Sequence, residues 1–351
     1  KDLKGKIVCV DAFNTLYQFL STVRQMDGTP LMDSAGCVTS HLSGILYRNV
    51  ALLSEGVKLI YVFDGEAPSL KAKTHKKRKE IRDLAKEKYE DAKASEDLES
   101  MKKYSSQLLR LDDEMIAESK ELLEALGVMV VQAPSEGEAE AAYLCAMHSE
   151  IYASVSQDYD SLIFGAPKLI RNLTVSRKRK TPGGYIEVKP EIIELDDFLG
   201  ELGINQDQLI SLGVLVGTDY NPKGVPGIGQ KRALDLVKKF PEPSELFDSL
   251  KDKIDELDEE DQFYWKDIFN LFKMPEVIDV EIEFPKVDAD KIREILIEKH
   301  EFSSDRIEKQ IDKLGALIKA GKQKNLGDWF GVIFLCSFYT QNKFYLVLDL
   351  F

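Results

Sequence analysis

Four short apolar runs of this chain lead into an aspartate, and this pattern constrains the fold more than any other feature. The runs are KIVCVDAF (6–13), LIYVFDG (59–65), ASVSQDYD (153–160) and LGVLVGTDY (212–220). A parallel strand delivers its last residue to the carboxyl edge of the sheet, where α/β proteins place their ligands. Several such strands would therefore bring aspartates that are distant in sequence to one place.

Seven acidic residues form the candidate cluster: the aspartates of these runs, which are Asp11, Asp64, Asp158, Asp160 and Asp219, and the additional pair Glu136 and Glu138. Each one alone has a simpler interpretation, because an aspartate at a strand end often caps a helix or turn, and Glu136 could favour the positive end of a helix. Together they indicate a shared site, since carboxylates at this density repel one another unless a cation is present. Hard oxygen ligands suit Mg²⁺ or Mn²⁺, so we predict a metal site.

Short segments rich in β-branched residues, typical of buried parallel strands, alternate with helical patterns. The strands are predicted at 6–11, 58–63, 128–132 and 151–155, and the helical patterns lie at 39–56 and 112–128. This alternation predicts an α/β fold with a central, mostly parallel twisted sheet flanked by helices. At 351 residues the chain can form one elaborate domain or two.

Residues 65–111 form a long charged insertion with a helical pattern, which we expect to project from the core and to be mobile. The chain as a whole has a net charge of −14, but residues 71–88 hold 9 basic and 3 acidic residues. A run of this kind is often only a solvated helix face. Because it follows Asp64 directly, it could equally attract a polyanion, since local fields act within about 10 Å.

A glycine-rich turn between two helical patterns is the second strong signal, in the segment GTDYNPKGVPGIGQKR (217–232). Gly227 and Gly229 would let a phosphate approach free N–H groups at a helix start, and Lys231 and Arg232 add positive charge. A lone GxG is weak evidence, but two helices around this turn resemble a helix–two-turn–helix element that grips duplex DNA by its backbone.

Three other features complete the sequence. Pro182-Gly183-Gly184 predicts a hairpin turn within 172–189, and an acidic helical region is expected over 241–318, where residues 241–290 hold 17 acidic and 5 basic residues. The cysteines Cys9, Cys37, Cys145 and Cys336 have no CxxC spacing and indicate reduced, mostly buried thiols. The absence of a signal peptide and of eighteen consecutive apolar residues favours an intracellular protein without a membrane span.

Five motifs, in order, carry a family resemblance: DAFNTLYQFL (11–20), YVFDGEAPSLKAKTHKKR (61–78), APSEGEAEAAYL (133–144), SQDYDSLIFG (156–165) and VGTDYNPKGVPGIGQKRA (216–233). With these motifs the chain resembles the flap endonucleases of the archaeal and eukaryotic type, within the XPG/Rad2-like structure-specific nucleases. The resemblance runs from about 5 to 330. It implies a single nuclease domain over 1–330, with an N-region at 1–80, an arch at about 65–111 and an I-region at about 112–240. The helix–two-turn–helix would lie at about 203–240.

The resemblance implies that the seven acidic residues hold two Mg²⁺ ions, for which Mn²⁺ can substitute, and that K⁺ binds at the helix–two-turn–helix. Lys71 and Arg78 are seven residues apart, on adjoining helical turns, and would stabilise the transition state. Tyr17 resembles an aromatic residue that stacks on an unpaired base. Further DNA contacts are implied for Arg24, Arg48, Arg171, Gly217, Gly227, Gly229, Lys231 and Arg232, and for Glu136 and Asp219 at the metals.

Near the C-terminus, QKNLGDWF (323–330) resembles the QxxLxxFF box that binds a sliding clamp of the proliferating cell nuclear antigen type. Gln323, Leu326, Trp329 and Phe330 would make this contact. The apolar segment 331–351 has no functional account. The chain begins at Lys1 and lacks the N-terminal residues of the family, including a glycine near the active site, so we expect a partial sequence.

The implied function is Mg²⁺-dependent cutting of 5′ flaps in branched DNA, with 5′–3′ exonuclease activity, by a monomer. The implied roles are Okazaki-fragment maturation and base excision repair, in an archaeal cytoplasm or nucleoid, or in a nucleus. Two other readings fit part of the sequence. A PIN-like ribonuclease shares an acidic α/β core but lacks the 217–232 element, and a non-catalytic clamp-bound DNA scaffold does not explain seven carboxylates.

Overall fold

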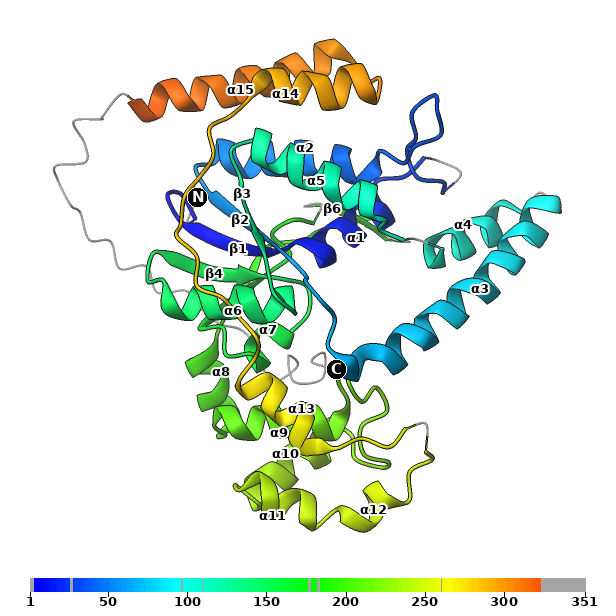
Figure 1. Cartoon of the computed structure of the whole chain (residues 1–351), viewed down its shortest axis with the longest axis vertical. Helices are drawn as coiled ribbons and strands as arrows, with labels where there is room; N and C mark the ends of the chain where they lie inside the picture. Colours follow the sequence, from blue (N-terminus) through cyan, green and yellow to red (C-terminus); the bar gives the residue numbers. More distant parts are fainter. Residues whose placement is uncertain are drawn as a thin grey trace.

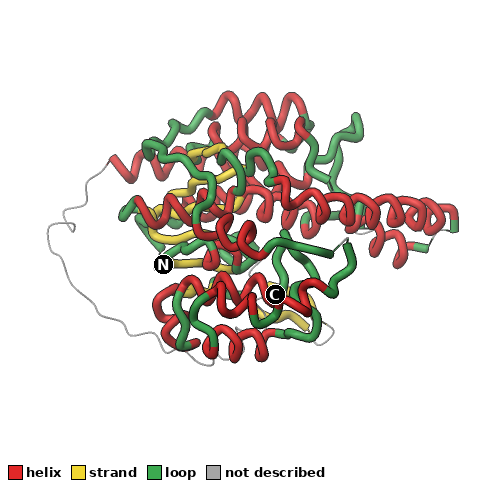
Figure 2. The backbone as a smooth tube through the Cα atoms, turned by 60° about the horizontal axis from the view of Figure 1, so that its bottom comes forward, coloured by secondary structure: helices red, strands yellow, loops and turns green. Residues whose placement is uncertain are grey.

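The computed structural model describes residues 3–25, 28–95, 97–108, 110–175, 178–181, 184–259 and 261–322. The central sheet is covered by helices, a long and a shorter helix project from one side, and a separate group of helices lies beneath the sheet (Figure 1). A second view shows the strands enclosed between layers of helix (Figure 2). The predicted α/β class is therefore confirmed.

The central sheet has six strands in the order β3-β2-β1-β4-β5-β8. All its neighbours pair in parallel except β8, which runs antiparallel to β5. The strands are β1 (Ile7–Asp11), β2 (Lys58–Phe63), β3 (Met129–Gln132), β4 (Ile151–Val155), β5 (Lys168–Arg171) and β8 (Glu191–Glu194). The four predicted strands are confirmed as β1 to β4, and their carboxyl ends lie on one edge.

Alternate residues of β1 point to opposite faces of the sheet and enter different cores. Val8 and Val10 lie in a core shared with α1, α2 and α5, whereas Cys9 packs in a second core with Ala141 and Leu144 of α6. Burying such side chains stabilises the sheet by about 1.5–3 kcal/mol each. These helices are α1 (Ala12–Thr22), α2 (Ser40–Ser54), α5 (Asp113–Ala125) and α6 (Gly137–Met147).

The charged insertion folds into a short turn and two helices, η1 (Ser69–Lys71), α3 (Ala72–Ala94) and α4 (Leu98–Gln107). The two helices contact each other and project from the body (Figure 1). The prediction of a helical, projecting insertion is confirmed. We call residues 69–107 the arch.

Beneath the sheet, a second helical layer surrounds a core that includes Phe198, Leu212, Phe247 and Phe272. Its members are α7 (Asp160–Ile163), α8 (Leu195–Leu202), α9 (Gln206–Val216), α10 (Gln230–Lys239), α11 (Pro243–Asp248), α12 (Lys251–Asp255) and α13 (Trp265–Lys273). Helices α9 and α10 pack together around the turn at 217–229, as the sequence predicted. Gly224 is required in this turn, because a Cβ there would lie 2.4 Å from the carbonyl oxygen of Val216.

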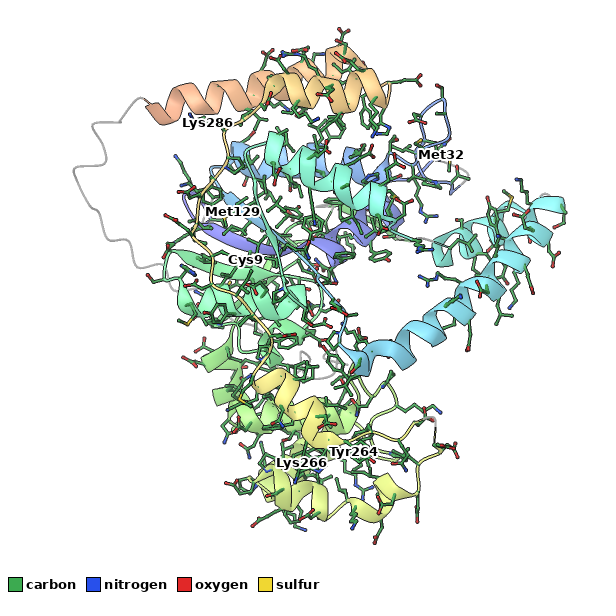
Figure 3. The ribbon with its side chains drawn as sticks, in the orientation of Figure 1. Cys9, Met32, Met129, Tyr264, Lys266 and Lys286 are labelled. Carbon is green, nitrogen blue, oxygen red and sulfur yellow. The ribbon has the colours of Figure 1, made fainter. Side chains whose placement is uncertain are left out.

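The helical region expected over 241–318 is interrupted, and the prediction is wrong for residues 274–288. This segment is extended and crosses the sheet as a strap, with Lys286 on the strap and Met129 and Cys9 on the sheet labelled in Figure 3. Its apolar residues Val280, Ile282 and Phe284 pack on the α6 side of the sheet. They recur every second residue, which suits an extended chain better than a helix.

The chain returns to helix at its described C-terminal end, where three elements pack over the core shared with α2 and α5. They are α14 (Ala289–Arg293), the π-helical η2 (Glu294–Lys299) and α15 (Ser304–Lys322).

The predicted hairpin is confirmed as the antiparallel pair β6 (Lys178–Thr181) and β7 (Gly184–Glu187). Its turn residues 182 and 183 lie outside the described residues. Cys9 and Cys145 are buried free thiols, Cys37 is an exposed one, and Cys336 falls outside the described part. Among the helices that the structure describes, none is both long enough and apolar enough to cross a membrane.

Candidate active site

The ends of neighbouring elements carry the acidic residues. Asp11 ends β1 and caps α1, where its Oδ1 accepts a hydrogen bond from the Asn14 N–H at 3.1 Å. Asp64 follows β2, and its Oδ1 accepts from the Gly137 N–H at 2.7 Å. Gly137 permits this approach, since a Cβ there would lie 2.7 Å from that same oxygen. The strand-end geometry expected from the sequence is thus present.

The remaining acidic residues belong to helix starts and turns. Glu136 caps α6 and Glu138 lies in its first turn, Asp158 follows β4, Asp160 begins α7, and Asp219 lies in the turn after α9. One cavity of about 980 Å³ is lined by all seven of these residues. Lys71, Tyr17, Arg171 and Gly217 line the same cavity. Residues up to 208 positions apart in sequence therefore meet at one edge of the sheet.

Burial and mutual repulsion make the carboxylates costly to ionise together. Burial, with repulsion from Asp64, raises the pKa of Asp11 to about 8. Burial, with repulsion from Asp219 and Asp158, raises the pKa of Asp160 to about 7. Burial also raises the pKa of Glu138 well above its usual value, and Asp11 adds to the effect. A cation in the cavity would relieve this repulsion.

Lys71 provides positive charge among these acids. Its Nζ lies 2.6 Å from Glu136 Oε2 and 3.5 Å from Asp219 Oδ2, and 5.4 Å from the centre of the Tyr220 ring. Burial alone would lower the pKa of Lys71, but attraction to Glu136 and Asp219 outweighs it and leaves the pKa raised. Lys71 is therefore held as an ammonium group in the cavity wall, directly before α3 begins.

The donor set suits hard divalent ions, because it consists of carboxylates from seven positions. Within the described residues, however, no three His, Cys, Asp or Glu side chains are already arranged to hold an ion. Several of the carboxylates accept hydrogen bonds from protein groups, such as Glu138 from Ser156 Oγ at 2.6 Å and Asp158 from Asn14 Nδ2 at 2.5 Å. The residues gathered here fit the predicted metal chemistry, and their role as ligands stays a prediction.

Sequence reasoning missed three polar residues that support the site. Asn14 bridges α1 to Asp158, Thr74 donates to the main-chain oxygen of Asp219 at 2.5 Å, and Tyr220 lies under Lys71. Asn14 could have been found, because it follows Asp11 at the spacing of a helix cap. The contact of Thr74 joins residues 145 positions apart, and no local pattern signals it.

The predicted DNA-contacting residues fall into different settings. Tyr17 is 38% exposed at the cavity, as a stacking residue would need to be. Arg171 also lines the cavity, where it donates to the Gln157 carbonyl at 3.1 Å and lies 4.2 Å from the centre of the Tyr159 ring. Arg48 lies half-buried on α2 and is not part of the cavity lining.

Arg24 makes protein contacts that the sequence did not indicate. Its Nη1 donates to the Gly28 carbonyl at 2.6 Å and to Ser105 Oγ at 2.8 Å, and its Nε donates to the Leu20 carbonyl at 3.0 Å. In this arrangement Arg24 connects α4 of the arch, through Ser105, to the loop after α1, through Gly28. A role in binding phosphate stays a prediction.

The glycine-rich turn leads into α10 at Gly229, which caps the helix without a side chain. Gly227 has a φ of 71° and accepts at its carbonyl from Arg232 Nη1 at 3.3 Å. Lys231 and Arg232 are exposed at the helix start. Positive charge is thus exposed at the start of α10, and phosphate binding at this turn stays a prediction.

Two groups of predicted site residues cannot be placed. Arg78 belongs to α3, but its side chain lies outside the described part. Gln323, Leu326, Trp329 and Phe330, together with the tail 331–351, lie outside the described residues altogether.

Two family models match the chain. The XPG N-terminal domain matches residues 1–85 and the XPG I-region matches residues 127–219. These two regions contain all seven acidic residues and leave most of the arch between them.

Curated relatives match almost the whole chain. Flap endonuclease 1 of Thermococcus onnurineus is 47% identical over 333 residues, which cover 94% of this chain and 95% of that protein. Flap endonuclease 1 of Pyrococcus furiosus is 46% identical over 332 residues, which cover 94% and 95%.

Solved structures agree with these relatives. The flap endonuclease-1 of Methanococcus jannaschii superposes with a TM-score of 0.71 at 40% identity, over 91% of this chain and 95% of that one. The catalytic core of Rad2 in complex with DNA substrate superposes with a TM-score of 0.61 at 23% identity, over 90% and 94%, and supports the fold alone.

Fold and site together define a structure-specific nuclease of the metal-dependent type, a hydrolase whose acidic cavity lies at the edge of an α/β sheet. The chain belongs to the flap endonuclease family, within the XPG/Rad2-like nucleases. The family predicted from the sequence motifs is confirmed.

Proposed function

We propose that this chain cuts branched DNA carrying a 5′ flap, near the junction of single and double strand, with its seven carboxylates holding two Mg²⁺ ions. The observation that carries the proposal is the single cavity lined by all seven acidic residues and by Lys71, at the mouth of the arch. A PIN-like ribonuclease would not need the arch or the glycine-rich turn, and a DNA scaffold would not need the acidic cavity.

Bound divalent ions would supply an activated water and a charge to stabilise the leaving oxygen of the phosphodiester. The ligands would be the side chains of Asp11, Asp64, Glu136, Glu138, Asp158, Asp160 and Asp219. The remaining chemistry belongs to the chain's own cations.

Lys71 would contact the scissile phosphate and stabilise the charge that builds up on it. The Lys71 ammonium is prepared for this role, because Glu136 and Asp219 hold it in the cavity in its charged form. A preorganised cation of this kind needs no rearrangement during the reaction. By family resemblance Arg78 would act beside it, and Tyr17 would stack on an unpaired base.

Duplex DNA would be held away from the reacting phosphate. The start of α10, with Gly227, Gly229, Lys231 and Arg232, offers N–H groups and positive charge to one strand's backbone. We place a K⁺ ion in this same turn by family resemblance. Arg48 and Arg171 would contact phosphates nearer the junction, while the arch admits the free 5′ end.

In the cell this activity would serve Okazaki-fragment maturation and base excision repair, and the same site would remove nucleotides from 5′ ends. The box at 323–330 would bring the enzyme, as a monomer, to a sliding clamp. The resulting product would be a nick with a 5′-phosphate that a ligase can close.

A labelled duplex with a 5′ flap tests the proposal directly. We expect cleavage near the junction with Mg²⁺ and none with EDTA, and we expect Asp158→Ala to bind the flap duplex while losing Mg²⁺-dependent cleavage by at least about 100-fold. Undiminished cutting by Asp158→Ala would refute the proposed site. Preference for a flap made of RNA would favour the ribonuclease.

A further inference from the structure

The first turn of α3 contains a buried polar residue that the proposed mechanism does not use. Thr74 is 6% exposed, and among the side chains of α3 that the structure describes it is the only buried polar one. The other buried residues of that described set are Ala85 and Ala92. A buried hydroxyl needs a hydrogen-bonding partner.

The partner of Thr74 is the backbone of a predicted metal ligand. Thr74 Oγ1 donates to the main-chain carbonyl oxygen of Asp219 at 2.5 Å. Threonine is stiff at χ1, so this short contact fixes the α3 backbone relative to the Asp219 backbone. The Lys71–Asp219 ion pair at 3.5 Å joins the end of η1 to the same turn, and it fixes the geometry less because the lysine side chain is long and flexible.

The turn on which Asp219 lies is held from the other side by Asn221. Asn221 Oδ1 accepts from the Thr218 N–H at 3.1 Å and from Thr218 Oγ1 at 2.7 Å, and its Nδ2 donates to the Val214 carbonyl of α9 at 2.7 Å. All three contacts join the turn to itself or to α9. Thr74 joins the turn to α3 through a side-chain hydrogen bond, and Lys71 adds an ion pair from η1.

We propose that Thr74 is a positioning residue: its hydrogen bond couples the position of the base of α3 to the placement of the Asp219 carboxylate. When the first turn of α3 packs against the Asp219 turn, the hydrogen bond holds the Asp219 backbone and directs its side chain into the cavity. When the base of α3 moves away, the turn loses this support and Asp219 is less well placed to bind an ion. The inference rests on the role of Asp219 as a metal ligand that is proposed above.

Two substitutions separate the hydroxyl from the shape of the side chain. Thr74→Val keeps the branched shape and removes the donor, and Thr74→Ser keeps the donor. Ser119→Ala is a matched control, because it removes a buried hydroxyl that donates to the Met115 carbonyl at 2.7 Å on α5. Thermal unfolding of all four proteins checks that each variant is folded.

The first measurement needs no DNA: calorimetric titration of each protein with Mn²⁺. We expect Thr74→Val to bind Mn²⁺ about tenfold more weakly, the size of effect seen when a group that orients a metal ligand is lost. Thr74→Ser and Ser119→Ala should stay within about twofold of the unaltered chain. On flap DNA, Thr74→Val should need about tenfold more Mg²⁺ to reach its half-maximal cleavage rate and should leave the KM for DNA unchanged.

The outcomes distinguish this inference from the proposed function. If the unaltered chain binds Mn²⁺ and folded Thr74→Val binds it equally well, the inference is overturned while the metal site stands. If the unaltered chain binds no Mn²⁺, the proposed function fails and the inference fails with it. Weaker binding by Thr74→Val alone, with Thr74→Ser and Ser119→Ala unaffected, supports the coupling.

Discussion

Lys71 illustrates how a single residue joins the arch to the acidic cavity. It lies at the end of η1, one residue before α3, and its ammonium group faces Glu136, Asp219 and the ring of Tyr220. The two carboxylates belong to α6 and to the turn after α9. Lys71 therefore contacts both of these elements at once.

Removing this charge should slow the chemical step more than it weakens DNA binding. We expect Lys71→Ala to lower kcat on flap DNA by about 100-fold, because a fixed cation acts on charge that develops only in the transition state. Lys79→Ala provides the comparison, since Lys79 is an exposed lysine of α3. Single-turnover cleavage and binding of the same labelled flap measure both effects. Equal losses in the two variants would show that only the total charge of α3 matters.

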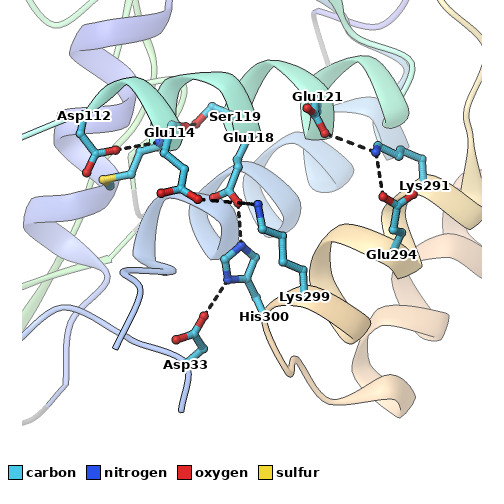
Figure 4. Close-up of polar contacts among 11 residues, drawn as sticks. Asp33, Asp112, Glu114, Glu118, Ser119, Glu121, Lys291, Glu294, Lys299 and His300 are labelled. Atoms are coloured by element: carbon cyan, nitrogen blue, oxygen red, sulfur yellow. Dashed lines mark hydrogen bonds and ion pairs between the residues drawn. The ribbon is translucent and has the colours of Figure 1, made fainter. Parts of the chain in front are cut away.

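At the scale of elements, the C-terminal helices are fastened to the core by a buried polar cluster. His300 lies between two carboxylates, with Nδ1 at 2.8 Å from Asp33 and Nε2 at 3.0 Å from Glu118 (Figure 4). Lys299 also pairs with Glu118. The cluster joins the end of η2 to α5 and to the loop that contains Asp33.

This cluster should make stability depend on acid pH. The hydrogen bond from His300 lowers the pKa of Asp33. A carboxyl group whose pKa is lowered on folding contributes stability above its unfolded value of about 3.9, and that stability is lost as the pH falls through the folded value. We therefore expect Asp33→Asn to be less stable than the unaltered chain at pH 7, and the difference to shrink below about pH 4.

Urea unfolding at several pH values measures this difference. Asp83→Asn is a suitable control, since Asp83 is an exposed residue of α3, and it should change the stability little at any pH. A difference between Asp33→Asn and the unaltered chain that stays constant from pH 7 to pH 3 would contradict the account of the cluster.

The sequence predicted those strands and helices that a short run of neighbouring residues encodes. The strands before Asp11 and Asp64 were predictable from β-branched runs, and their shared edge followed from the parallel sheet. The contact between Arg24 and Ser105 was not, because its partners are 81 residues apart and neither has a distinctive neighbourhood. The strap at 274–288 was missed because its acidic composition suggested a solvated helix, although Ile282 and Phe284 alternate as an extended segment does.

At the scale of the whole molecule, side-chain hydrogen bonds tie both helices of the arch to the body, in addition to the ion pairs of Lys71. Thr74 of α3 bonds to the turn that contains Asp219, and Ser105 of α4 bonds to Arg24. Between them, α3 and α4 contact each other, and few of their described side chains are buried. Regions with few buried contacts open at low free energy, so we expect the arch to be the part most easily cleaved by trypsin.

A threaded 5′ end should protect the arch. We expect flap DNA with Ca²⁺ in place of Mg²⁺ to slow tryptic cleavage within α3 and α4 by about tenfold, because binding stabilises the closed form by mass action. A fully paired duplex of the same length should protect far less. Cleavage near Lys251 in α12, which lies away from the arch in Figure 1, is the internal control. Equal protection by both DNAs would show that the arch does not meet the single strand.

The central claim is that carboxylates from distant parts of the chain bind divalent ions in one cavity, and anomalous diffraction from crystals soaked in Mn²⁺ tests it most directly. We predict two Mn²⁺ peaks inside the cavity lined by Asp11 and Asp160, each coordinated by carboxylate oxygens from more than one element. An empty cavity in crystals of a chain that still cuts flap DNA with Mn²⁺ would contradict it.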